Sequence, residues 1–239
     1  MPGRFATVDV EAPDGFPLDA YNAVYNGIPK KARRRKRLWV DFRDAWSAVA
    51  YRFLSLTYYA DAFAESVRND GIAPAQPMRA EQERFAFGCI LNALSCLETA
   101  HYGLFAVGAL VSKGFPLRNE KDRGRVTMDR TAKKFAQVFP KKEPVTVALR
   151  RVKRARAVKR LQTVRNIIAH RANPPRGFRM SDPNRADWKL TKGPMKLGAT
   201  TLTAIRADVA DLLEVLLDPA AKFVEKHFPA RRRRVVRNP

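Results

Sequence analysis

The segment from Phe85 to Val111 constrains the fold more than any other part of this 239-residue chain. It is apolar on almost every face of a helix, which is typical of the centre of a helical bundle or of a membrane span. Its middle carries five polar side chains, those of Asn92, Ser95, Glu98, Thr99 and His101. Because a charge at the centre of a bilayer costs about 2.5–3.5 kcal/mol, we expect a buried helix over residues 78–111 and no membrane.

Apolar residues at helical spacing predict further helices on both sides of this one. Together the predicted helices cover residues 38–69, 78–111, 128–139, 144–172 and 200–228. Alternation around Lys192-Gly193-Pro194 gives a weak hairpin signal. We therefore predict an all-α fold, a helical bundle of about five helices with a basic N-terminal arm and a disordered basic C-terminal tail.

Composition divides the chain into three parts. Residues 1–29 are rich in Pro, Gly and Asp, carry a local charge of −3, and predict an irregular acidic arm that leads into the basic run 30–37. Residues 30–229 predict a single helical domain in which 173–199 is an insertion. Residues 230–239 predict a basic, disordered tail.

The charge of the chain favours a polyanionic partner. Against 46 Lys and Arg stand 23 Asp and Glu, so the formal net charge is +23. A surplus of this size favours nucleic acid before a membrane surface. Residues 30–37, 118–160 and 231–237 hold 28 of the 46 cations, so the positive charge is concentrated in three blocks.

The stretch 150–160 is the most cationic part of a predicted helix, with seven cations and no acid. Seven like charges repel one another, and contact with a phosphate backbone relieves that repulsion. The predicted RNA-binding residues are Arg150, Arg151, Lys153, Arg154, Arg156, Lys159, Arg160 and Arg171. On one continuous helix over 144–172, the cations at 150, 154 and 160 would lie about 22, 16 and 8 Å along the axis from Arg165. Aromatic residues near Phe178 or Trp188 could then stack bases.

Cysteines and histidines are too few and too scattered to build a disulfide framework or a metal site. Cys89 and Cys96 are seven residues apart on one helical face, and we expect them to be small core residues. His101, His170 and His227 lie far apart in the sequence and form no zinc signature, so we expect no metal and no cofactor. The N-terminus lacks the order of a signal peptide, which indicates the cytoplasm.

Four polar residues of the central helix fall on one face, because positions three and four apart share a face. They are Asn92, Ser95, Thr99 and Tyr102. They either hydrogen-bond within the bundle or, with Glu98 at their flank, line a site.

A short motif follows the cationic stretch directly. Arg165-Asn166 is followed by three residues and then by His170; apolar Val164 precedes the pair, and apolar Ile167 and Ile168 follow it. In an all-α chain and beside a cationic helix, this pattern resembles the motif of the HEPN ribonucleases, a family that includes bacterial toxins and abortive-infection proteins. The resemblance covers about seven residues, with an architectural likeness over residues 38–217. The central helix, with Ser95 and Glu98, is similar to the polar-lined core helix of that family.

The resemblance implies a metal-independent endoribonuclease with Arg165, Asn166 and His170 as its catalytic residues and with Glu98 and Ser95 in support. It implies a composite site in a homodimer, a toxin or antiviral-defence role, and a protein or RNA antitoxin as a further partner. The chemistry agrees, since the RNA 2′-hydroxyl is the nucleophile, histidine moves protons near neutral pH, and arginine binds phosphate oxygens. On a helix, positions 165 and 170 point about 140° apart, whereas 166 and 170 share a face, so two facing helices of a dimer would complete the site.

Two other functions remain open from the sequence. The same fold could bind a structured RNA without cleaving it. A DNA-binding or membrane-surface protein is the third reading, although the sequence contains no groove-reading motif.

Overall fold

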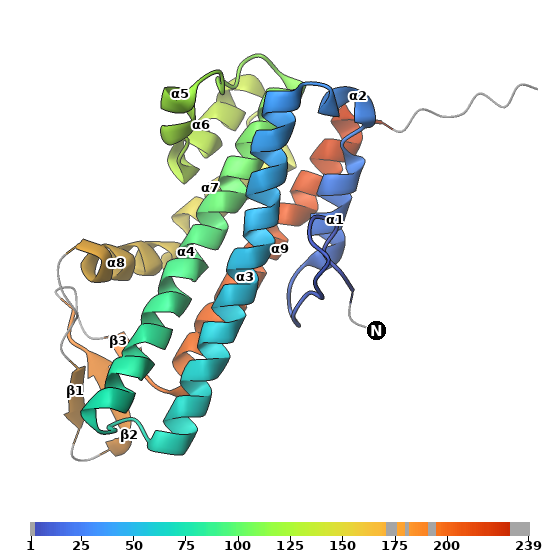
Figure 1. The fold of residues 1–239 in the computed structure, drawn as a ribbon. Helices are drawn as coiled ribbons and strands as arrows, with labels where there is room; N and C mark the ends of the chain where they lie inside the picture. Colours follow the sequence, from blue (N-terminus) through green and yellow to red (C-terminus); the bar gives the residue numbers. More distant parts are fainter. Residues whose placement is uncertain (1–2, 171–175, 180–181, 191–194, 230–239) are drawn as a thin grey trace, which may run out of the picture.

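The computed structural model describes residues 3–170, 176–179, 182–190 and 195–229. The helices of this part are α1 (Leu18–Gly27), α2 (Lys30–Arg33), α3 (Lys36–Asp70), α4 (Gln76–Val111), α5 (Glu120–Gly124), α6 (Met128–Val138), α7 (Pro144–Arg154), α8 (Arg156–His170) and α9 (Ala199–His227). Three strands, β1 (Arg176–Arg179), β2 (Asp182–Trp188) and β3 (Met195–Leu197), form a small antiparallel sheet at one end of the bundle (Figure 1). The predicted all-α architecture is confirmed.

The long helices α3 and α4 form an antiparallel hairpin at the centre of the bundle, and α9 packs against both (Figure 1). Gly71, with a φ of 72°, ends α3 in a conformation that favours glycine. Gly103 permits the close approach of the two helices, because a Cβ at this position would lie 2.7 Å from the Trp46 ring.

Burial explains the apolar character of α4. Among the described residues, it is the one helix long and apolar enough to cross a membrane, and 72% of its most apolar 18-residue stretch lies buried within the bundle. Cys89 and Cys96 are free and fully buried, as predicted, and burial raises the pKa of each thiol to about 12. Both thiols are therefore inert packing groups at neutral pH.

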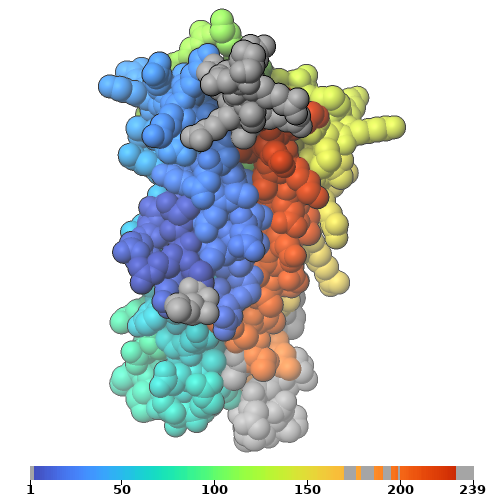
Figure 2. Space-filling model, turned by 90° about the vertical axis from the view of Figure 1, so that its right-hand side faces the viewer, coloured from blue at the N-terminus to red at the C-terminus, as the bar shows by residue number. Residues whose placement is uncertain are grey.

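The prediction of an irregular arm over residues 1–29 is wrong for residues 18–27, which form α1. This helix lies beside α9 on one face of the molecule (Figure 2). Its Tyr21 ring stacks on Trp46 with ring centroids 5.3 Å apart. Tyr21 Oη donates to the Trp46 carbonyl (2.7 Å), and Trp46 Nε1 donates to the Tyr21 carbonyl (3.1 Å). The aromatic residues of the arm belong to the core. Their burial stabilises ordered structure in this segment despite its Pro and Gly content.

By sequence the Pro-rich residues 173–187 are typical of a loop, yet β1 and most of β2 lie within this range. The predicted hairpin strands are confirmed, with Trp188 of β2 opposite Met195 of β3, while its turn at 191–194 lies outside the described residues. Arg176 ties the sheet to α4, because its Nη1 donates to Gln82 Oε1 (2.9 Å). Trp188 is fully buried and so cannot stack bases, whereas Phe178 remains 42% exposed.

The single helix predicted over 144–172 is broken at Ala155. This residue has an extended backbone (φ −57°, ψ 139°) and separates α7 from α8, which turns away from α7 (Figure 1). α7 packs against α6 and α9, while α8 packs against α4. Both helices bury an apolar side: Val152 of α7 and Val158, Leu161 and Val164 of α8 are buried, and Ile168 is partly buried. The axial distances predicted for a straight helix therefore do not hold for Arg150 and Arg154.

Candidate functional site

Arg165 lies on the side of α8 that faces α4. Its Nη2 donates to Glu98 Oε1 over 3.2 Å, and the two side chains remain 32% and 40% exposed. Glu98, one of the two residues expected to support the motif, therefore lies beside the motif arginine. Ser95, one turn earlier on α4, is partly buried and lines neither of the cavities described below.

The motif remains helical to its end. Asn166 is exposed, and His170 is the last residue of α8; the His170 side chain lies outside the described part. Because α8 does not unwind before His170, positions 165 and 170 lie about 140° apart around its axis. A single chain therefore does not place these two positions on one face, while positions 166 and 170 share a face.

A cavity of about 600 Å³ opens beside Arg165, between α8, α4, α7 and the start of α6. From α8 it is lined by Lys159, Gln162 and Arg165, and from α4 by Glu98. Val126 and the almost fully buried Met128 add apolar surface. The motif arginine is therefore part of a concave, mixed-charge surface.

A second cavity of about 380 Å³ shares Glu98 and Val126 with the first and extends toward α3. Thr99 and Tyr102 line it, so half of the predicted polar face borders a cavity. Asn92 instead donates to the Gly88 carbonyl of its own helix (2.8 Å). The polar face thus serves both of the purposes expected from the sequence.

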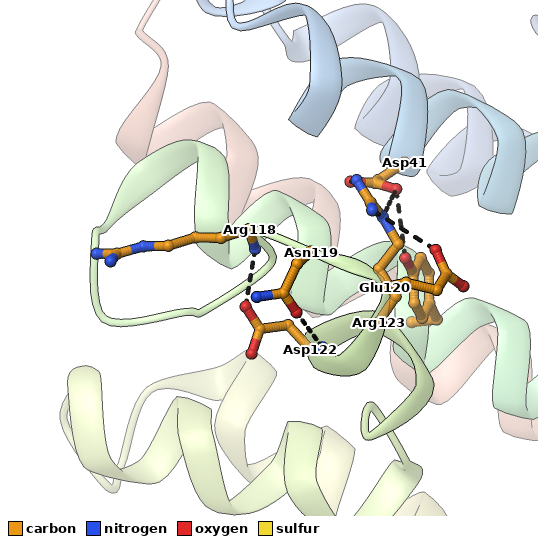
Figure 3. A network of polar contacts seen from close by, with 7 residues as sticks. Asp41, Arg118, Asn119, Glu120, Asp122 and Arg123 are labelled. Atoms are coloured by element: carbon orange, nitrogen blue, oxygen red, sulfur yellow. Dashed lines mark hydrogen bonds and ion pairs between the residues drawn. The ribbon is translucent and has the colours of Figure 1, made fainter.

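An ion-pair network that the sequence did not predict includes Asp41 and Tyr102, which line the second cavity (Figure 3). Arg123 of α5 donates from Nε to Asp41 Oδ1 on α3 (2.8 Å), and Glu120 lies 3.7 Å from Arg123 Nη1. The hydroxyl of Tyr102 donates to the same Asp41 carboxylate. Burial of the phenol and, second, the negative charge of Asp41 raise the pKa of Tyr102 to about 12. Asn119 caps α5 by accepting from the backbone nitrogen of Asp122. The short α5 is therefore held against α3.

Asp129 anchors the opposite wall of the larger cavity. It accepts from Lys133 (2.8 Å) and from Lys153, and these two hydrogen bonds, in that order, lower the pKa of its carboxyl. Lys153, predicted to bind RNA, is thus engaged with α6 and lines the cavity.

The other predicted RNA-binding cations form an open surface at the break between α7 and α8. Those that are exposed are Arg151, Arg154, Arg156, Lys159 and Arg160. Arg150 is partly buried, and Arg171 lies outside the described residues. This surface leads along α8 to Arg165.

His101 is a core residue. It is fully buried in α4, its Nδ1 lies 2.8 Å from the Leu97 carbonyl oxygen, and burial lowers its pKa to about 4. Three or more His, Cys, Asp or Glu side chains in a metal-binding arrangement do not occur among the described residues.

Comparison with protein-family models, with curated proteins and with solved structures finds no match to this chain. The likeness to HEPN ribonucleases therefore rests on the residues from Arg165 to His170 and on the helical architecture.

Proposed function

We propose that this protein is a metal-independent endoribonuclease of the HEPN type that cleaves single-stranded RNA at a site formed by α8. One observation carries the proposal. Arg165 lines a cavity beside Glu98, on the same short helix that ends at His170 and carries exposed cations near its start. In this proposal the single helix α8 carries both the cations that bind the RNA backbone and the arginine that binds the phosphate to be cleaved.

The reaction that these residues can support is an internal transesterification. A base removes the proton of the 2′-hydroxyl, the oxygen attacks the adjacent phosphorus, and the bond to the 5′-oxygen breaks as that oxygen accepts a proton. The products are a 2′,3′-cyclic phosphate and a 5′-hydroxyl. His170 is the residue suited to the proton transfers, and Arg165 is suited to the growing charge on the phosphate oxygens.

A two-fold dimer completes this site in the proposal. Positions 165 and 170 diverge on one α8, so a phosphate held by Arg165 of one protomer would meet His170 of its partner. The exposed Asn166, which shares a face with position 170, is placed to orient the imidazole. Two histidines then serve as base and acid.

RNA binding without cleavage is the second candidate function. The Arg165–Glu98 ion pair favours it, because a carboxylate beside the guanidinium offsets part of the charge that a phosphate would meet. In this case the exposed cations of α7 and α8 would hold a structured RNA and His170 would be dispensable.

The resemblance further suggests a toxin or phage-defence role in the cytoplasm, with a protein or RNA antitoxin as a second partner. Inducible expression in a bacterial host tests this part. We expect growth arrest with the wild-type chain and normal growth with His170→Ala; equal growth in both strains would refute a toxic nuclease.

Cleavage is tested with purified protein and mixed RNA in EDTA. We expect 2′,3′-cyclic phosphate ends with the wild type, no products with His170→Ala, and RNA binding by both. Activity retained in His170→Ala would overturn the assignment. When wild type and His170→Ala are mixed equally and allowed to exchange subunits, a site that needs both histidines should keep about a quarter of the activity. About three quarters of the activity of the same amount of wild-type protein would show that one histidine per dimer suffices.

A further inference from the structure

The cavity beside Arg165 has a lining suited to one nucleotide. Its volume of about 600 Å³ lies within the range of about 300–1,000 Å³ usual for small-molecule sites. Cations at Lys159 and Arg165 can hold phosphate, and Val126 with Met128 offers apolar surface to a base.

The order of residues along α8 places one uncharged polar side chain, which could contact a base, between two cations. Lys159, Gln162 and Arg165 follow one another at intervals of three residues, or about 4.5 Å along the helix axis. A base at Gln162 would therefore have a cation on either side for its flanking phosphates.

Beside its cations, this cavity contains one acidic group with free acceptor positions, the Glu98 carboxylate. Asp129 is occupied by Lys133 and Lys153. Glu98 accepts one hydrogen bond from Arg165, although a carboxylate has about four lone-pair positions. The Gln162 amide forms no hydrogen bond with another described residue. An ionised carboxylate can only accept hydrogen bonds, so the free positions of Glu98 are complementary to an amino group and not to a carbonyl, and the Gln162 amide oxygen can accept a second hydrogen bond from the same amino group.

We propose that this cavity binds one nucleotide of the RNA and selects a base with an exocyclic amino group, with Glu98 as the acceptor that disfavours a carbonyl and Gln162 as a second specificity-determining residue. Adenine, cytosine and guanine carry such a group, whereas uracil presents a carbonyl at the corresponding edge. The inference rests on the proposed function in that the nucleotide belongs to the RNA substrate.

Binding of two mononucleotides measures this selection without cleavage. 3′-CMP and 3′-UMP match in size and charge but differ in the amino or carbonyl group at C4. We expect the wild type to bind 3′-CMP about tenfold more tightly in calorimetric titration. Gln162→Leu, which preserves the shape of the side chain, should reduce this preference. Thr163→Val is the control, since the Thr163 hydroxyl donates to the Lys159 carbonyl of its own helix (3.0 Å).

Equal affinity of the wild type for the two nucleotides would overturn the proposal, as would a preference unchanged in Gln162→Leu. Circular dichroism melting of each variant ensures that a lost preference does not reflect unfolding. Selection of 3′-CMP by a protein that cleaves no RNA would support the nucleotide site and refute the proposed nuclease. Cleavage of RNA without base selection would support the nuclease and refute the nucleotide site.

Discussion

Neutralising the cations at the break between α7 and α8 should weaken RNA binding in a salt-dependent way. Arg154, Arg156 and Arg160 are exposed there, and changing all three to Gln removes up to three phosphate contacts. Each contact to a single strand contributes about 0.7 to the slope of log K against log salt, so the slope should fall by about 2. Affinity should drop about a hundredfold at 0.1 M salt, and the difference should vanish toward 1 M.

Fluorescence anisotropy with a labelled single strand, repeated across salt concentrations, measures this slope. The matched control changes Lys30, Lys31 and Arg34 to Gln, because these exposed cations lie around α2, near the opposite end of α3 from the sheet. We expect the control to change the slope far less. An unchanged slope in the first variant, or a larger effect from deleting residues 231–239, would refute the assignment of the RNA track to α7 and α8.

Three further perturbations test the fold and the site. Glu98→Gln should change the free energy of unfolding by less than about 1 kcal/mol, because the ion pair of Glu98 with Arg165 is partly exposed. The same variant should bind RNA more tightly. A large loss of stability would contradict the first of these expectations. Gly103→Ala should cost on the order of 1–3 kcal/mol in urea unfolding by crowding the α3 indole, whereas Gly124→Ala, which meets open space, should cost much less. Burial lowers the pKa of His101 from 6.5 to about 4, so the unfolded chain takes up this proton first and stability should fall by about 3 kcal/mol from pH 6.5 to 4. A His101→Gln variant with the same pH dependence would contradict the last prediction.

The bundle could be predicted because its signals are local. The apolar run of α4 and the helical spacing on α3 and α9 follow directly from residue order, and these three helices form the core. The helix α1 and the strand β1 could not be predicted, because their stability is not local. α1 depends on the stacking of Tyr21 against Trp46, 25 residues away, and the sheet depends on the bond from Arg176 to Gln82.

The candidate site was predictable only in part for the same reason. Arg165, Asn166 and His170 stand out from their spacing, and Glu98 from its charge within an apolar helix. Residue spacing does not show that Arg165 pairs with Glu98, that α5 is held by Asp41, or that Gln162 lines a cavity. The break at Ala155 had no sequence signal, since alanine is the best helix former.

The role of the RNA 2′-hydroxyl is the most direct test of the proposed reaction. Once a cleavage position has been mapped, an RNA with one 2′-deoxy nucleotide immediately before that bond is incubated with the protein in EDTA. We predict that this bond survives while other cleavable bonds in the same strand are cut, because the missing hydroxyl is the nucleophile. Cleavage of the 2′-deoxy position at the normal rate would contradict the account.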